Sequence, residues 1–467
     1  MHIRNKQYPQ YFDIQNSLLS TDTEFWVTNV NFQSMYTTCL TVKCKEITKE
    51  KNISIGRQHI KYSKNKFIFF SNAFLTVLRN SSQEIIGISL QKKENKIELY
   101  GQIQNWINVL MKECISLDFI SNYQIIQLIG RGSSANVYQV LSKIDDINYA
   151  IKVFDKTQLE TDYQIKQSLL FEIQYLKLFN HPNIVKYFGV FESNSQIILI
   201  SELLLGGDLN SNIEDRKIDE DQIKIIMKSI LGGLDYVHSF GIFHRDIKKC
   251  NIMLRNQNSY DSICLIDFGL AEKANIENDY LFRYCGTPGC VAPEILRKQK
   301  YGLKVDIYSV GILCYQLMFG KDPFKSNTTK ETIVKNFLGH IDFTDTSSIS
   351  KSGINFLKGL IDIDPQIRFS AAQALKHPFL QPEINKILVN GNRFNAYVRK
   401  EPLKLKPLLF HNSRNQSPNT VVKTSPCKFY LKTDMSPQSN REKTNNDSSR
   451  LISKSFFLRN YKKMNTK

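Results

Sequence analysis

The sequence lacks any long hydrophobic run. No stretch approaches the roughly 18 apolar residues that a membrane-spanning helix needs, and the first ten residues, MHIRNKQYPQ, lack the apolar core of a secretory signal peptide. These two absences argue against a transmembrane protein and against a secreted one. We therefore expect a cytoplasmic chain that reaches a membrane only as a peripheral protein.

Cysteine is present, but without the spacing that disulfide-rich or zinc-binding chains show. The nine cysteines are an odd number, and they are not grouped in short pairs. A calcium-binding loop pattern is also absent. We expect most of the cysteines to be small buried side chains in a reducing compartment.

Acidic residues are scarce at the C-terminal end. The net charge is +18, and residues 381–467 contribute +13 of it, from 18 Lys and Arg against 5 Asp and Glu. The same segment is rich in Asn and Ser, with Ser-Pro pairs at Ser417, Ser425 and Ser436. We interpret it as a disordered basic tail. Binding to nucleic acid is the alternative for such a segment, but we expect no nucleic-acid partner.

The length of 467 residues predicts two to four domains, at ~150 residues each. Residues 1–20 show no period and are interpreted as a lead-in. From about residue 24 to residue 100, short runs of β-branched and aromatic residues alternate with polar clusters such as residues 49–52 and 80–82. This pattern predicts an antiparallel sheet, in a small β-barrel or sandwich. The runs are residues 25–27, 36–42, 66–70, 74–78, 85–90 and 96–100.

A helix is predicted at the end of this part, because apolar residues recur at helical spacing between residues 102 and 115. Strands followed by an amphipathic helix with a central tryptophan, here Trp106, resemble a pleckstrin-homology domain. We therefore assign residues 21–118 to a pleckstrin-homology-like domain with Trp106 as its core anchor. Basic residues gather near one predicted strand pair: Arg57, Lys61, Lys64 and Lys66. They suggest an acidic phospholipid as a partner, and a domain that binds protein, or nothing, is the alternative.

Two short motifs further along carry the chemistry. The stretch GIFHRDIKKCN offers a carboxylate, an ammonium group and an amide in Asp246, Lys248 and Asn251. Asp267 follows the apolar run ICLI, which predicts a short buried strand with Asp267 at its open end. One carboxylate to accept a hydroxyl proton, an amide and a second carboxylate to hold metal, and a lysine to neutralise phosphate describe phosphoryl transfer. Either motif alone is as often a plain structural turn.

Matching motifs lie upstream. In the string LIGRGSSANVY, glycines allow backbone N–H groups to approach nucleotide phosphates, although Ala135 stands where a third glycine is usual. The strand YAIKV then presents Lys152, and a lysine in so apolar a strand needs a partner, because an unpaired buried charge is costly. Glu172, on a predicted helix near residues 168–178, supplies that partner.

In their order and spacing, the motifs between residues 123 and 380 resemble a eukaryotic serine/threonine protein kinase domain, most like those of the calmodulin-dependent group. The resemblance implies an α+β bilobal fold, with a β-rich small lobe and an α-helical large lobe. It implies ATP and Mg²⁺ as cofactors and proteins as substrates. Asp246 would accept the proton of the substrate hydroxyl, and Lys248 would neutralise charge on the transferring group. Asn251 and Asp267 would coordinate Mg²⁺.

The resemblance also assigns a nucleotide pocket. The residues that it implies there are Ile129, Gly130, Gly132, Val137, Ala150, Lys152, Glu202, Leu204, Asp208 and Met253. The pair Lys152–Glu172 would hold the α- and β-phosphates. Backbone groups of Glu202 and Leu204 would bond adenine, and Asp208 would approach the ribose or a basic substrate residue.

From residue 221 onward the apolar period is helical. By the same resemblance, Asp306 begins a segment that braces the catalytic loop, and Arg368 pairs with Glu294. Thr287 would bridge the catalytic aspartate and lysine, a role that is typical of serine/threonine kinases rather than tyrosine kinases.

Two further expectations concern regulation and substrate. Arg245, beside the catalytic aspartate, implies an anionic partner, and we hypothesise that Glu277 or Asp279 serves it permanently, or that no pairing is needed. Cys250 and Gln316 stand where kinases that favour arginine before the acceptor carry acids, so we predict only a weak preference for basic substrates.

Two alternatives belong to other functional classes. The first is a pseudokinase scaffold that uses the fold for binding alone. The second is a lipid- or partner-binding protein whose N-terminal domain sets its location and whose kinase lobe is secondary.

Overall fold

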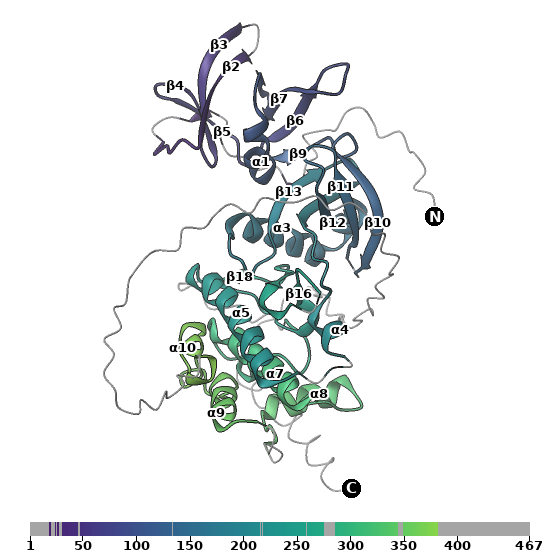
Figure 1. The fold of residues 1–467 in the computed structure, drawn as a ribbon, viewed down its shortest axis with the longest axis vertical. Coiled ribbons are helices and arrows are strands. Elements are labelled where there is room, and N and C mark those ends of the chain that lie inside the picture. The colour runs from purple at the N-terminus through teal and green to yellow at the C-terminus, as the bar shows by residue number, and fades with distance from the viewer. Residues whose placement is uncertain are drawn as a thin grey trace, which may run out of the picture.

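A computed structural model of the chain describes residues 18–19, 24, 26–27, 30–44, 47–132, 134–214, 216, 218–257, 259–274, 285–343 and 349–381. Within these residues an N-terminal sheet, a small β-rich lobe and a larger helical lobe follow one another in space as they do along the chain (Figure 1). Apart from Gln381, the expected basic tail lies outside the described residues.

The N-terminal sheet consists of two meanders followed by a helix. Its elements are β1 (Trp26–Val27), β2 (Tyr36–Cys44), β3 (Ile47–Ile55), β4 (His59–Ser63), β5 (Lys66–Phe69), β6 (Phe74–Arg79), β7 (Ile85–Lys92), β8 (Asn95–Tyr100), α1 (Gln104–Glu113) and β9 (Ile115–Ser116). The strands pair in the order β1-β5-β4-β3-β2-β8-β7-β6, and within the described residues no pairing closes this series into a barrel. The β-rich architecture agrees with the sequence, whereas a closed barrel is not seen.

One polar cluster that was expected to separate strands instead lies inside one. Strand β3 runs through residues 49–52, where Leu40 of β2 stands opposite Lys51. The side chains of this part of β3 are mostly solvent-exposed. A strand held by backbone hydrogen bonds to one neighbour needs no apolar side chains there, so composition alone concealed it.

Helix α1 closes the core of the N-terminal part. Trp106, Ile107, Leu110 and Met111 lie on its buried face, and Trp106 is only 1% exposed. Burying side chains of this size stabilises the fold by roughly 1.5–3 kcal/mol each. The same apolar cluster continues into the strands of the small lobe, so the two parts share one core.

The small lobe is an antiparallel sheet with one long helix. Its elements are β10 (Tyr123–Arg131), β11 (Asn136–Ser142), β12 (Asn148–Asp155), α2 (Lys156–Thr161), α3 (Tyr163–Leu178), β13 (Tyr187–Glu192) and β14 (Gln196–Glu202). Asp162 caps the start of helix α3, because its carboxylate accepts hydrogen bonds from the backbone N–H groups of Gln164 and Ile165. This cap fixes the start of the helix that carries Glu172.

The large lobe is built around α7, which is apolar on all sides and almost wholly buried. Its elements are α4 (Leu209–Ile213), α5 (Glu220–Ser239), β15 (Ile242–Phe243), the 3₁₀ helix η2 (Lys249–Asn251), β16 (Ile252–Leu254), η3 (Tyr260–Ser262), β17 (Ile263–Leu265), β18 (Glu272–Lys273), α6 (Pro293–Leu296), α7 (Lys304–Phe319), α8 (Thr329–Leu338), α9 (Lys351–Leu360), α10 (Ala371–Leu375) and η4 (Pro378–Leu380). Among the described residues, no helix combines the length and apolar character needed to cross a membrane.

Two residues of the lead-in are described, and they are docked. Leu19 is 8% exposed and packs into the core of the kinase-like part. The backbone N–H of Leu18 donates to the carboxylate of Glu192 at 2.8 Å. Glu192 also forms a buried ion pair with Lys156 at 2.7 Å. The other residues of the lead-in lie outside the described residues.

Candidate active site

The loop that carries Asp246 is fixed by a buried carboxylate. Asp306, in the first turn of α7, accepts the backbone N–H groups of His244 and Arg245, each at 2.8 Å, and the ring Nε2 of His238 at 2.9 Å. Burial by itself would raise the pKa of Asp306, but the bond from His238 and the charges nearby outweigh it and lower that pKa. Arg245 has a left-handed backbone, φ 66°. This conformation costs energy in a non-glycine residue and persists only because the surroundings enforce it.

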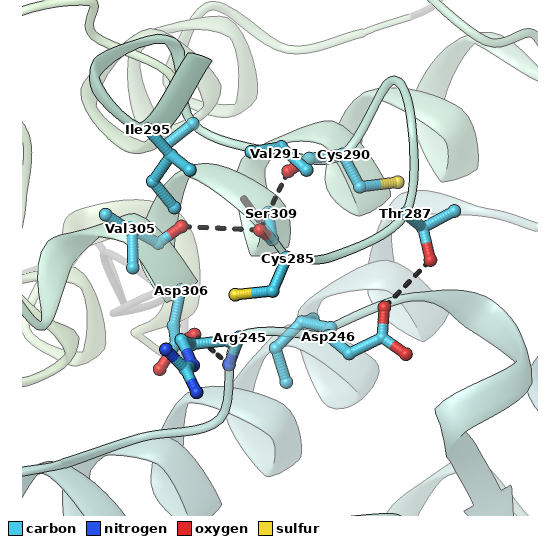
Figure 2. Close-up of a pocket in the computed structure, with 12 residues that line it drawn as sticks. Arg245, Asp246, Cys285, Thr287, Cys290, Val291, Ile295, Val305, Asp306 and Ser309 are labelled. Carbon is cyan, nitrogen blue, oxygen red and sulfur yellow. Dashed lines mark hydrogen bonds between the residues drawn. The ribbon is translucent and has the colours of Figure 1, made fainter. Parts of the chain in front are cut away.

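Asp246 is the meeting point of three polar side chains. Its Oδ1 accepts a hydrogen bond from the hydroxyl of Thr287 at 2.8 Å (Figure 2). Its Oδ2 accepts one from Nδ2 of Asn251 at 2.8 Å and lies 2.7 Å from Nζ of Lys248. Lys248 also donates to the Thr287 hydroxyl at 3.1 Å. The carboxylate is thereby held in one orientation, with a lysine beside it.

Asn251 and Asp267 are brought together by a short hairpin. Strands β16 and β17 pair so that Ile252 lies opposite Leu265, and the N–H of Ile266 donates to the carbonyl of Asn251 at 3.0 Å. Asn251 just before β16 and Asp267 just after β17 therefore lie at the same end of the hairpin.

Lys152 lies between two carboxylates. Its Nζ is 2.8 Å from Oε2 of Glu172 and 3.5 Å from Oδ1 of Asp267. The charge of Lys152 lowers the pKa of Asp267, against the opposing effect of burial. Burial raises the pKa of Glu172, and Lys152 opposes that rise. Lys152 thus connects helix α3 of the small lobe to the site in the large lobe.

The donor set fits a magnesium ion that is shared with phosphate. The Nδ2 of Asn251 is used in two bonds to Asp246, which leaves the amide oxygen as the atom that could hold a cation. Asp267 adds a carboxylate whose pKa is lowered, so it is ionised at neutral pH. Mg²⁺ in nucleotide sites takes one or two such oxygens from the protein and the remainder from phosphates and water.

The glycine-rich string forms the turn between β10 and β11. The N–H of Gly132 donates to the carbonyl of Ala135 at 2.8 Å and closes this turn. Val137 lies opposite Lys152 in the pairing of β11 with β12. Ile129 and Gly130 lie in β10, which pairs with β11. Ser133 is outside the described residues.

The expected adenine contacts follow β14. Ala150 pairs with Ser201, the last residue but one of that strand. The N–H of Glu202 donates to the carbonyl of Lys186 at 2.9 Å, so only its carbonyl remains for a base. Leu204 is buried in the segment that follows.

The carboxylate of Asp208 already has a structural role, so a contact with ribose would use oxygens that are hydrogen-bonded within the protein. It caps α4, where its two oxygens accept from the N–H and the hydroxyl of Ser211 at 2.9 and 3.0 Å. Met253 forms an isolated β-bridge with Asp208, so it lies beneath the segment that leads into α4.

A groove of about 370 Å³ extends from the catalytic loop across the large lobe. Its lysines are Lys248, Lys249 and Lys325, and its one acid among the described residues is Asp322. Asp322 accepts a hydrogen bond from Gln316. The groove is therefore cationic next to the site where Asp246 lies.

Arg245 has an acidic partner that our hypothesis did not name. Its Nη1 lies 2.6 Å from Oε2 of Glu272, whereas Glu277 and Asp279 lie outside the described residues. Strand β18 brings Glu272 to this place, because Glu272 pairs with Phe243 of β15, two residues before Arg245. The signal in the sequence was Glu272 itself, three residues after Gly269. Our prediction missed it because β18, the strand that carries it, has only two residues and shows no strand pattern.

A buried ion pair connects the start of α6 with the segment between α9 and α10. Arg368 donates to both oxygens of Glu294, at 2.6 and 3.0 Å. The exposed fractions of the two side chains are 0% and 2%. Arg368 also donates to the carbonyls of Asp362 and Lys304. This pair anchors the segment that follows Thr287.

Much of the chain is similar to known proteins. A family model described as the protein kinase domain matches residues 123–380. The chain is 34% identical over 309 residues to the probable serine/threonine-protein kinase fhkC of Dictyostelium discoideum, with 65% of this chain and 50% of that protein covered. It is 34% identical over 276 residues to serine/threonine-protein kinase DCLK3 of Mus musculus, with 58% and 34% covered. It is 30% identical over 279 residues to myosin light chain kinase A of Dictyostelium discoideum, with 59% and 94% covered. The chain thus spans half of the first of these relatives and about a third of the second.

Proposed function

Because this chain belongs to the protein kinase family, we propose that it transfers the γ-phosphate of ATP to serine and threonine hydroxyls of other proteins. The observation that carries the proposal is the set of contacts around Asp246. A carboxylate oriented by Thr287 and Asn251, with Lys248 beside it, is suited to an alcohol acceptor and an anionic phosphoryl group.

In this mechanism Asp246 orients the acceptor hydroxyl and accepts its proton. Lys248 offsets the negative charge that spreads over the transferring phosphoryl oxygens. Lys152, kept in place by Glu172, holds the phosphates of the nucleotide. Asn251 and Asp267 would hold Mg²⁺, which would supply positive charge next to the phosphates. Most of the catalysis is then positioning and electrostatics rather than covalent chemistry.

The proposal is tested by incubating the full chain with γ-labelled ATP, Mg²⁺ and a generic protein acceptor. We expect label in phosphoserine and phosphothreonine after acid hydrolysis, and none in phosphotyrosine. A pseudokinase would give no more transfer than a variant without the Asp246 carboxylate, and that result would refute the proposal.

For residues 21–118 we propose a pleckstrin-homology-like module that binds acidic phospholipid surfaces and places the kinase at membranes. Two meanders followed by a helix with a buried Trp106 support the first part. The second part is supported by Lys61, Lys64 and Lys66, which are exposed together on the β4–β5 hairpin. Arg57 does not belong to this group, because it lies in the preceding turn, 4.0 Å from Glu113.

Reversing the charge of Lys61, Lys64 and Lys66 to Glu should weaken binding of the full chain to phosphatidylserine-rich vesicles by on the order of 100-fold, since each basic residue near such a surface contributes about 1 kcal/mol. The measurement is vesicle co-sedimentation at physiological salt. The matched control reverses three exposed lysines of the large lobe, Lys330, Lys351 and Lys376, because it changes the net charge by the same amount. An equal loss in both variants would mean that the basic chain binds non-specifically, and the proposal would fail.

We also propose that the substrate groove has little preference for arginine before the acceptor. Arginine there should raise kcat/KM by less than about fivefold, because an exposed charge pair contributes about 1 kcal/mol or less, and Asp322 is already bonded to Gln316. A peptide series with arginine placed at successive positions measures this. The variant Cys250→Glu adds a carboxylate to the groove and should gain an arginine preference. A strong arginine requirement in the unaltered chain would contradict the prediction.

A further inference from the structure

The N-terminal part and the small lobe share one β-sheet. Strand β9 lies between β6 and β13 and is parallel to both: Ile115 pairs with Phe74 on one side and with Val190 on the other (Figure 1). The N–H of Ile115 donates to the carbonyl of Ala73 at 2.8 Å. A strand with neighbours on both sides cannot move relative to either without breaking backbone hydrogen bonds. Movement of one part relative to the other would therefore disrupt the pairing of β9.

Helix α1 packs against β13 at very short range. A Cβ added to Gly189 would lie 2.8 Å from the carbonyl oxygen of Met111 and 3.7 Å from the Met111 side chain. That approach is closer than any side chain tolerates, so the backbones meet only because residue 189 is glycine. The contact is thus specific in shape as well as apolar.

The third contact reaches helix α3. Nζ of Lys177 donates to Oδ1 of Asn72 at 2.8 Å and to the carbonyl of Glu113 at 3.0 Å. Asn72, with φ 56°, also donates its N–H to the same carbonyl at 2.8 Å. Burial lowers the pKa of Lys177 and the charge of Glu113 opposes that effect. The Glu113 side chain is itself buried and accepts from Ser71 at 3.2 Å. Lys177 therefore binds to a polar site that Asn72 and the end of α1 form in the N-terminal part.

Lys177 lies five residues after Glu172 on the same helix. At 3.6 residues per turn the two side chains point about 140° apart around the helix axis, and their Cα atoms are about 7.5 Å apart along it. Glu172 faces Lys152 in the active site, while Lys177 faces Asn72 and Glu113. Lys177 also lies in the last turn of α3, where a positive charge interacts favourably with the helix dipole. Helix α3 is thus held on one side by the catalytic lysine and on another by the N-terminal part.

We propose that Lys177 is a positioning residue, through which the N-terminal part holds α3 where Glu172 reaches Lys152. Catalysis needs the Lys152–Glu172 pair. If Glu172 made the only polar contact that holds α3, the helix could shift and leave Lys152 with Asp267 as its only acidic partner. The partner surface is formed by Asn72 and the end of α1, so the N-terminal part supports catalysis in the same chain. The kinetic part of this inference rests on the proposed kinase activity.

The test compares four variants of the full chain. Lys177→Met keeps the aliphatic stem and removes the ammonium group, and Asn72→Gly removes the acceptor while keeping the left-handed backbone that glycine tolerates. Both should lower kcat/KM for ATP about tenfold, which is the lower end of what losing a charged hydrogen bond changes in a two-state equilibrium. Gln174→Met, at an exposed position of α3, should not change it. Glu172→Gln removes the carboxylate through which Lys177 is proposed to act.

The decisive comparison is made in the Glu172→Gln background. If Lys177 acts through Glu172, adding Lys177→Met to Glu172→Gln should change kcat/KM less than twofold. A full additional tenfold loss, or an unchanged kcat/KM in both Lys177→Met and Asn72→Gly, would overturn the proposal. If Lys177→Met does not fold, Asn72→Gly decides the question by the same comparison.

Amide hydrogen exchange provides a readout that does not depend on phosphoryl transfer. Exchange in residues 163–178 should be faster in Lys177→Met and Asn72→Gly than in Gln174→Met. If the chain proved inactive, faster exchange would still support the inference about α3, and unchanged exchange would refute it. Failure of the proposed function and failure of this inference are thereby distinguished.

Discussion

The Asp246→Asn variant is expected to phosphorylate a peptide acceptor roughly 10²–10⁴-fold more slowly than the unaltered chain, which is the usual contribution of a positioned general base. Asparagine has nearly the same shape and can still accept the hydrogen bond that Thr287 donates at 2.8 Å. It cannot accept the acceptor's proton, and it removes the charge that Lys248 meets at 2.7 Å. The loss should therefore appear in kcat, measured with MgATP and peptide near saturation.

The nucleotide end of the site should be almost unaffected by this substitution. Lys152, Glu172 and Asp267 form their own cluster, so the KM for ATP is expected to stay within about threefold, or roughly 0.7 kcal/mol. Asp221→Asn is the matched control, because Asp221 is 85% exposed on α5 and carries the same change of group. If Asp246→Asn retained more than a tenth of the activity, Asp246 would not be the base.

The second large effect concerns stability. Arg368→Met should lower the free energy of unfolding by about 3–5 kcal/mol, because it leaves the buried carboxylate of Glu294 without its partner. Arg368 is fully buried and donates to Glu294 and to three backbone carbonyls. The loss can be measured from denaturant unfolding followed by far-ultraviolet circular dichroism.

Two further variants separate loss of the charge pair from loss of volume. The double variant Glu294→Gln/Arg368→Met no longer buries a charge and should regain part of the lost stability. Lys351→Met, an exposed change in the same lobe, should stay within about 0.5 kcal/mol of the unaltered chain. An Arg368→Met variant within 1 kcal/mol, on the order of the experimental error for such a measurement, would contradict the expectation.

The family could be identified from the sequence because its characteristic residues lie close together along the chain. Asp246, Lys248 and Asn251 lie within six residues of one another, and a loop that short leaves few geometries open. Asp267 could be placed because an apolar run before it predicted β17. The spacing between Lys152 and Glu172 likewise follows from one strand and one helix. In each case the secondary structure that delivers the side chain has a clear pattern in the sequence.

The features that sequence reasoning missed depend on contacts between distant segments. Lys177 and Asn72 are 105 residues apart, and each looks like an ordinary surface residue in its own segment. Glu272 pairs with Arg245 because strands β15 and β18 lie side by side. Strands of two residues are too short to show an alternation of apolar and polar residues. Strand β3 was absent from our prediction because its exposed half is polar. Pairing with a neighbour, rather than side-chain composition, decides such cases.

The shared strand β9 has a practical consequence for dissecting this protein. A fragment beginning at Tyr123 would contain every residue of the phosphate-transfer site. It would, however, lack β9, so Val190 and Phe191 of β13 would become part of an exposed edge strand. Its backbone groups and the apolar surface that α1 now covers would become a template for self-association. We therefore expect the protein kinase domain and the preceding sheet to behave as one unit when the chain is expressed.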